Sequence, residues 1–212
     1  SAMSSDHAPM AEAANAKQVE VIYGPSTLLF GSGAIGGVVN VADDRFHEFQ
    51  YQGFESSLRT RFSSADQGRE LSGSIAAGKG QGVLHLSGFN RSSEDYAVGA
   101  SNNFDDKVTN TDTQSQGANV ALNWVNDRYG YSGVALSTLK YEYGVPNPDG
   151  ERATVAPEQT KIDVVSAWHY LMPNLELWKT QLSINDYEHV EGTNGQAVGF
   201  FEQDTMELKS TL

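Results

Sequence analysis

The sequence contains no cysteine, and this absence excludes several kinds of chemistry at once. A chain without thiols has no disulfide framework, no thiolate metal site and no cysteine nucleophile, although its compartment is left open. Basic residues are also few: 14 lysines and arginines stand against 27 aspartates and glutamates, a formal net charge of -13. A field of that sign opposes binding to nucleic acid or to an anionic lipid surface, and it favours a cationic partner or a metal ion.

Long hydrophobic runs are missing as well. No segment approaches the run of about 18 apolar residues that a transmembrane helix needs, although the strands of a membrane β-barrel would not show such a run either. Residues 1–3, Ser1-Ala2-Met3, resemble a cloning scar, and no signal peptide follows them. We therefore expect a mature segment or a piece of a longer protein.

Glycines at positions 31, 33 and 36 match the G-x-G-x-x-G pattern of dinucleotide-binding loops. That loop must lead from a strand into a helix whose amides face a pyrophosphate. Here Gly24-Pro25 interrupts the preceding strand-like run, and the β-branched stretch 38–41 follows where the helix should begin. The sequence therefore predicts strands on both sides of the glycines and no nucleotide site.

From Phe54 onward, apolar and polar residues alternate with a period of two in segments of about ten residues, the length of a tilted membrane-spanning strand. The pattern predicts an all-β fold, an antiparallel up-and-down meander of about eight strands. Its apolar positions are Phe54, Leu58, Phe62, Leu71, Ile75, Leu84, Leu86, Val120, Leu122, Trp124, Val134, Leu136, Ile162, Val164, Trp168, Trp178, Leu182, Ile184, Met206 and Leu208.

The connections between these segments alternate in length. Short turns are expected at 64–68, 79–82, 126–130 and 172–174, and long loops at 93–114, 143–160 and 188–198. Short turns at one end and longer loops at the other are typical of an outer-membrane barrel. A soluble antiparallel sandwich is the alternative, although its strands are usually nearer five or six residues.

The stretch "VEVIYGPSTLLFGSGAIGGVVNVAD", residues 19–43, resembles the C-terminal signature of the plug domain of TonB-dependent outer-membrane receptors. In that family a Val-Glu-Val strand leads to Gly-Pro, an aromatic-Gly-Ser turn, Ala-Ile-Gly-Gly and a valine-rich strand ending in Asn. The residues expected to have a structural role in this motif are Gly24, Pro25, Gly31, Ser32, Gly33, Gly36, Gly37 and Asn40.

The resemblance implies that residues 4–45 are the C-terminal part of a plug domain and that residues 46–212 are the first barrel strands. A complete receptor has about 22 strands, far more than this chain can supply, so the resemblance implies a fragment. Its parent would take up a substrate through the outer membrane of a Gram-negative cell. The parent's partner would be a TonB-type energy-coupling protein, whose binding segment is absent here.

Three short patches are most similar to the zinc-uptake receptors of that family: Asp6-His7-Ala8, Tyr143-Gly144-Val145-Pro146 and Asp186-Tyr187-Glu188-His189. Residues 143–160 depart from that type, because they carry no histidine where a His-rich run is common. The expected substrate is therefore a metal ion, with zinc as one candidate, or a metal chelate. No other cofactor is expected.

Glu188, His189 and Glu191 are the candidate metal ligands, since imidazole and carboxylate suit zinc and similar divalent ions. The alternative is a solvated acidic loop, and the same alternative applies to Asp149, Glu151 and Glu158. None of the five histidines forms an i, i+4 pair.

No catalytic constellation is found, so the chain is not expected to be an enzyme. The carboxylates Asp43 and Asp44, like Asp105 and Asp106, are adjacent in sequence, and neighbouring residues of a strand face opposite ways. No G-x-S-x-G elbow is present. The competing hypotheses are a soluble all-β binding module, such as an adhesin or carbohydrate-binding domain, and, more distantly, a dinucleotide enzyme.

Eight strands taken from a larger barrel would leave two edges. We therefore expect an open antiparallel sheet, or an edge-paired homo-oligomer in which copies cover those edges. A closed eight-stranded barrel is the alternative.

Overall fold

A computed structural model describes residues 10–11, 14–25, 27, 37–99, 106–146 and 150–212. The chain divides into two compact units, Ser1–Asp44 and Arg45–Leu212. Several residues singled out in the sequence lie outside the described ranges, namely Asp6, His7, Ala8, Gly31, Ser32, Gly33, Gly36, Asp105 and Asp149.

The described part of the first unit contains an antiparallel strand pair, β1 (Gln18–Ile22) and β2 (Val38–Ala42). Both strands were expected on either side of the glycine-rich stretch, and both are confirmed. The Asn40 amide donates a hydrogen bond of 3.0 Å to the carboxylate of Glu20, its cross-strand neighbour. Because β2 begins directly after Gly37, a strand occupies the position where a dinucleotide loop would need a helix.

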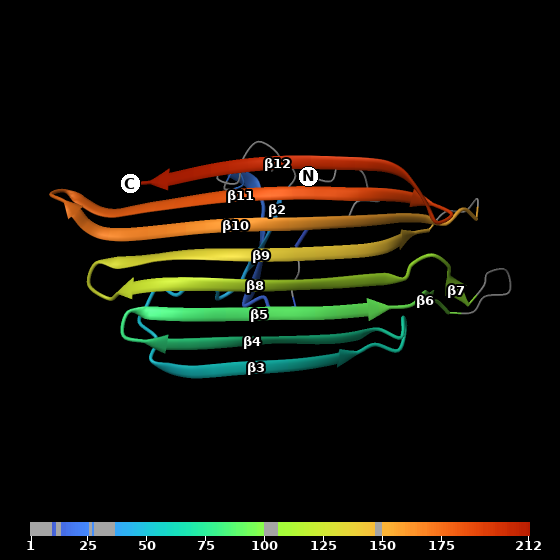
Figure 1. Cartoon of the computed structure of the whole chain (residues 1–212), viewed down its shortest axis with the longest axis horizontal. Coiled ribbons are helices and arrows are strands. Elements are labelled where there is room, and N and C mark those ends of the chain that lie inside the picture. The colour runs from blue at the N-terminus through green and yellow to red at the C-terminus, as the bar shows by residue number, and fades with distance from the viewer. Residues whose placement is uncertain (1–9, 12–13, 26, 28–36, 100–105, 147–149) are drawn as a thin grey trace. The chain divides into compact units, whose positions relative to one another are not determined.

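The second unit is one antiparallel sheet of eight strands, which lie side by side in chain order (Figure 1). The strands are β3 (Gly53–Phe62), β4 (Arg69–Lys79), β5 (Gly82–Ser93), β8 (Thr113–Asn126), β9 (Gly130–Val145), β10 (Ala153–Met172), β11 (Leu175–Thr193) and β12 (Gln196–Thr211). A small hairpin of β6 (Tyr96–Ala97) and β7 (Lys107–Val108) lies in the connection between β5 and β8. The predicted all-β, up-and-down meander of about eight strands is confirmed, and the sheet is open, with β3 and β12 as its edges.

Two of the predicted long loops are wrong in extent. Residues 188–198 belong almost wholly to β11 and β12, which are joined by Asn194 and Gly195 alone. Both turn residues have positive φ, 52° and 79°, as a two-residue hairpin turn requires. The loop predicted at 143–160 shrinks to 146–152, because β9 and β10 extend into it. The ends of these strands are polar and show no hydrophobic alternation, so the sequence predicted loops there.

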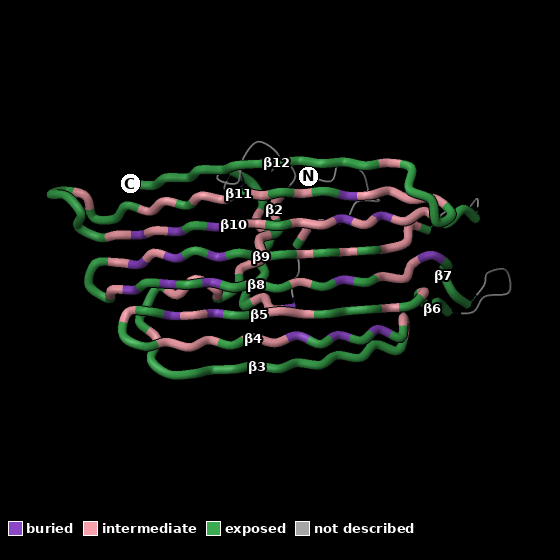
Figure 2. The backbone as a smooth tube through the Cα atoms, in the orientation of Figure 1, coloured by how far each residue is buried: buried purple, intermediate pink, exposed green. Residues whose placement is uncertain are grey.

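The sheet has two chemically different faces. Figure 2 shows buried and half-buried positions alternating with exposed ones along the inner strands, whereas the edge strands β3 and β12 are exposed almost throughout. One set of alternating side chains is largely aliphatic, and we call its side the apolar face. The opposite side carries the serine, asparagine, histidine and charged positions, and we call it the polar face.

Residues 45–52, here called the strap, run across the polar face before β3 begins. A cluster of buried side chains lies on this face and consists of Val83, Val125, Tyr131, Val165 and Ala167, with Phe46 and Tyr51 of the strap packed against it. Within the described ranges, no helix is long and apolar enough to cross a membrane.

Candidate functional site

The apolar face carries a band of aliphatic side chains that runs across the sheet in register. One row joins Leu86, Val120, Leu136, Ile162, Ile184 and Met206 as direct cross-strand neighbours. The next row joins Leu84, Leu122, Val134, Val164, Leu182 and Leu208. We call these two rows the apolar belt.

The belt is exposed although it is hydrophobic. Leu122 is 57% exposed, Leu136 44% and Met206 73%. Soluble monomers rarely show contiguous apolar patches larger than a few hundred Å². A band that crosses six neighbouring strands therefore points to a surface that meets something other than water.

Indole rings border the belt at the end of the sheet where the short turns lie. The rings of Trp124 and Trp168 are 5.4 Å apart, and Trp178 is the cross-strand neighbour of Trp168. Each of two indole N–H groups donates to a serine on this face: Trp168 to Ser166 at 2.6 Å and Trp178 to Ser210 at 3.0 Å. The tryptophans thus form a polar-tipped aromatic border, typical of an interface between an apolar and an aqueous phase.

Charged residues border the belt on its other side. Asp186 and Asp204 are direct neighbours one row beyond Ile184 and Met206, and Lys140 pairs with Glu158 at 2.5 Å one row further. At about 3.3 Å per residue along a strand, the distance from Ile162 to Trp168 is roughly 20 Å. The apolar surface therefore has a limited height, with tryptophans on one side and polar and charged residues on the other.

The polar face is organised around a buried carboxylate. Asp163 of β10 receives a hydrogen bond of 2.5 Å from the Ser183 hydroxyl and lies 3.2 Å from the Lys161 ammonium. The Arg45 guanidinium of the strap lies 3.5 Å from the same carboxylate and donates to the Ser137 hydroxyl at 3.0 Å. Arg45 thereby links the strap to strands β9 and β10.

Asn123 of β8 fixes the strap backbone. Its amide nitrogen donates to the Arg45 carbonyl at 2.9 Å, and its amide oxygen accepts from the His47 backbone N–H at 3.3 Å. The ring of Phe46 lies above Gly133, where a Cβ would come within 2.6 Å of it. One buried side chain thus satisfies two backbone groups of the strap.

The second half of the strap is held at the short-turn end of the sheet. The Tyr131 hydroxyl donates to the Glu48 carboxylate at 3.0 Å, and the Gln50 backbone N–H donates to Asp127 at 2.8 Å. Gln52 makes two bonds with the backbone of Gly80, one as donor at 2.7 Å and one as acceptor at 3.1 Å. The strap is therefore anchored along its whole length.

Removing the Asp163 carboxylate should destabilise the sheet. Asp163→Ala leaves the partly exposed Arg45 and Lys161 without their shared counter-ion and the Ser183 hydroxyl without its acceptor, so we expect a loss of about 2 kcal/mol. Urea unfolding followed by tryptophan fluorescence measures the loss. Glu158→Ala is the matched control, since its exposed pair with Lys140 is worth about 0–1 kcal/mol. Equal losses in both variants would contradict the role assigned to Asp163.

The structure brings two of the three predicted metal ligands together and separates the third. His189 Nε2 lies 3.5 Å from Glu191 Oε1, and its ring stacks on Phe201 with centroids 4.5 Å apart. Glu188 lies on the opposite face, next to Glu158 and Glu202 in the ladder. Across the described residues, no three His, Asp or Glu side chains are grouped so that they could hold one metal ion.

One pair of histidines was not predicted. His47 of the strap and His85 of β5 are far apart in sequence, yet their ring centroids lie 6.2 Å apart on the polar face. His85 is only 2% exposed. The alternation in β5 places His85 on the face opposite Leu84 and Leu86, but nothing in the strap sequence indicates where His47 docks.

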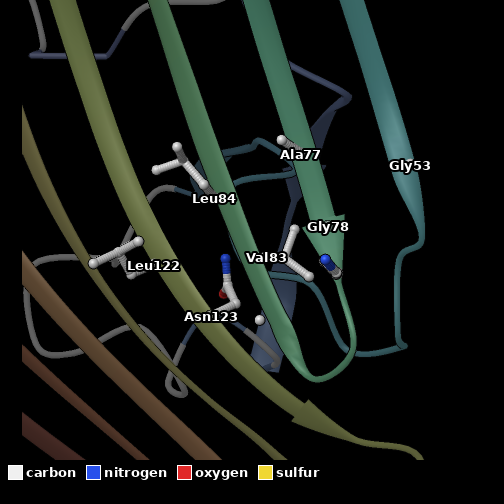
Figure 3. A pocket seen from close by; sticks show the side chains of 9 residues that line it. Gly53, Ala77, Gly78, Val83, Leu84, Leu122 and Asn123 are labelled. Atoms are coloured by element: carbon white, nitrogen blue, oxygen red, sulfur yellow. The ribbon is translucent and has the colours of Figure 1, made fainter.

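A hollow at the β4–β5 turn is shown in Figure 3. Val83 and Asn123 reach it from the polar face, and Leu84 and Leu122 from the apolar face. The lining brings together no pair of titratable side chains. Lys79 is the one titratable residue of this lining.

No model of a known protein family matches the sequence. The features of the chain that point to a function are the two faces of its sheet and residues 19–43.

Proposed function

We propose that this chain is part of a TonB-dependent outer-membrane receptor that takes up a metal ion, such as zinc, or a metal chelate. In this proposal the apolar belt faces lipid, the polar face lines the interior of the barrel, and the first unit is the end of the plug. The observation that carries the proposal is the belt itself, in register from β5 to β12 and bordered by tryptophans.

The arrangement of burial supports a lipid-facing role. In a soluble sheet the aliphatic face is covered and the polar face is solvated, whereas here the strap packs on the polar face and the aliphatic face is exposed. Transfer of one leucine or isoleucine side chain out of water contributes about 1.5–3 kcal/mol. Two rows of such side chains therefore give a strong preference for an apolar phase.

The two edges of the sheet support the proposal that it belongs to a larger barrel. β3 and β12 each pair with one neighbour in the described sheet, and strand edges exposed to lipid would leave backbone groups without partners. Both edge strands carry apolar residues on the belt side, Leu58 on β3 and Met206 on β12, which are 78% and 73% exposed. In the parent barrel, further strands would extend the belt at both edges.

The substrate and the partner depend on the resemblance. A TonB-type protein would pull on the plug of the full-length receptor, and this chain by itself is not expected to transport. The acidic balance of the chain, with a formal net charge of -13, favours a cationic substrate.

A soluble carbohydrate-binding module is the second candidate, and one observation favours it. Trp124 and Trp178 are 46% and 39% exposed and lie with Trp168 on one sheet face, as an aromatic platform for sugar rings would.

Tryptophan quenching separates these two functions, because all three tryptophans lie on the apolar face. The full chain is mixed with vesicles of brominated phospholipid and, separately, with aqueous iodide. The outer-membrane proposal expects strong quenching by the brominated lipid and weak quenching by iodide. Full access to iodide, no partition into vesicles and a fluorescence change with oligosaccharides would instead support the soluble module.

Zinc binding tests the metal part of the proposal. If His189 and Glu191 contribute to a zinc site, His189→Gln and Glu191→Gln should each weaken that site about tenfold or more in calorimetric titrations with zinc chloride. Glu188→Gln is the matched control, because Glu188 lies on the opposite face and should leave the affinity unchanged. Loss of zinc binding in Glu188→Gln would contradict the grouping.

A further inference from the structure

His47 and His85 form a contact between the strap and the sheet that neither the proposed transport function nor the belt requires. Their rings are tilted by 54° with centroids 6.2 Å apart. The ring atoms Nε2 of His47 and Nδ1 of His85 are both buried. Two imidazoles from separate elements therefore bring ring nitrogens into one enclosed region of the polar face.

The backbones that carry the two imidazoles are fixed by other contacts. The His47 backbone is held by Asn123 at 3.3 Å, and the Tyr51 ring lies 5.8 Å from the His47 ring. In the ladder, His85 stands between Ala76 and Ala121, whose side chains end at Cβ. Small neighbours on both sides leave the His85 ring accessible from the strap.

We propose that His47 and His85 bind one transition-metal ion of the zinc, nickel or copper class and thereby clip the strap to β5. With metal–nitrogen bonds of about 2.0–2.1 Å, two ring centroids bound to one ion lie roughly 5 to 6 Å apart, depending on the bond angle. The separation of 6.2 Å lies close to this range, so a small side-chain rotation brings both rings onto one ion. Neutral imidazole is a preferred ligand of all three ions.

Two protein ligands leave the other coordination positions to water or to ligands that a chelated ion already carries. The acidic residue of the strap, Glu48, follows His47 in sequence, and its carboxylate accepts a hydrogen bond from the Tyr131 hydroxyl. The site is distinct from the pair formed by His189 and Glu191, which lies on β11. It goes beyond the proposed function, because binding at this pair does not require the sheet to lie in a membrane.

The test is a titration of the refolded full chain with copper(II) chloride and, in parallel, zinc chloride. Calorimetry gives the affinity, and electron paramagnetic resonance counts the nitrogens on copper. His47→Gln and His85→Gln should each weaken binding about tenfold or more and each remove one coordinated nitrogen. His169→Gln is the control, because that ring is exposed at the short-turn end and contacts the Glu176 carbonyl at 3.1 Å.

The clip has its own readout, trypsin cleavage after Arg45. Copper should slow this cleavage in the unsubstituted chain and should have no effect in either His47→Gln or His85→Gln. Unchanged affinity and nitrogen count in both variants would overturn the proposal, and so would loss of binding in His189→Gln alone. Circular dichroism of each variant shows whether the sheet is intact, and His47→Gln, which lies outside the sheet, gives the answer if His85→Gln does not fold.

The metal-binding test and the lipid-quenching test of the proposed function can fail independently of each other. Quenching by brominated lipid should be the same in His47→Gln and His85→Gln as in the unsubstituted chain, because both residues lie on the polar face. Failure of metal binding with normal lipid quenching would reject the clip alone. Metal binding at the pair without lipid quenching would reject the membrane proposal alone.

Discussion

Leu122→Arg is expected to abolish stable association of the sheet with lipid vesicles. Leu122 lies in the second row of the apolar belt, between Leu84 and Val134, and is 57% exposed. An arginine on the lipid face of a membrane strand costs about 2–4 kcal/mol near the bilayer midplane and about 0–1 kcal/mol near the interface. Partition into vesicles, measured by flotation, should therefore fall on the order of thirtyfold or more for a cost above about 2 kcal/mol.

The same substitution separates the two functional hypotheses, because they predict different outcomes for one exposed residue. In a soluble sheet, a surface change from leucine to arginine usually alters stability by less than about 0.5 kcal/mol. Gln116→Arg on the same strand and the same face is the matched control, since Gln116 pairs with Asn90 and Lys140 beyond the belt. If Leu122→Arg and Gln116→Arg partition equally well, the lipid-facing assignment of the belt is wrong.

The belt could be predicted from the sequence because its apolar residues alternate strictly with the residues of the opposite face. Every residue of its two rows was identified from the period of two, and the ladder aligns them. The pattern fails where strands continue beyond the belt. On β11, Asp186 and Glu188 continue the belt side, while His189 and Glu191 lie on the other side. Both sides then carry charged or polar residues, so the hydrophobic alternation is lost although backbone pairing continues.

One local signal in that region was available from the sequence. Asn194-Gly195 is the dipeptide most typical of a two-residue hairpin turn, and it marks the β11–β12 connection within the stretch that had been predicted as loop. Turn chemistry was therefore more informative there than polarity.

The strap could not be predicted, because it has no periodicity of its own. Residues 45–52 are ordered by groups contributed from β8 and β9 and from two turns, and the pair of His47 with His85 depends on that docking. Contacts of this kind are set by tertiary geometry and leave no trace in local spacing. For the same reason, sequence reasoning grouped Glu188 with His189, whereas the strand places them on opposite faces.

Gly130→Ala, at the first residue of β9, is expected to destabilise the sheet strongly. Gly130 has φ of +132°, and a Cβ there would overlap the carbonyl oxygen of Ala167 on β10. Backbone strain of this kind costs about 1–3 kcal/mol, and relief of the clash must shift β9 away from β10. We expect a total loss on the order of 3 kcal/mol or more, measured as a lower urea midpoint.

Gly195→Ala measures the cost of backbone strain without a steric clash. Gly195 also has positive φ, +79°, but no atom lies within 4 Å of its Cβ position. Its loss should be about 1 kcal/mol, the usual effect of alanine at a left-handed position. The difference between the two variants measures how tightly β9 and β10 approach each other where Trp168 faces Gly130. Equal losses of unfolding free energy in the two variants would mean that β9 and β10 can move apart at Gly130 without cost. The close approach of the two strands would then not hold Trp168 in place.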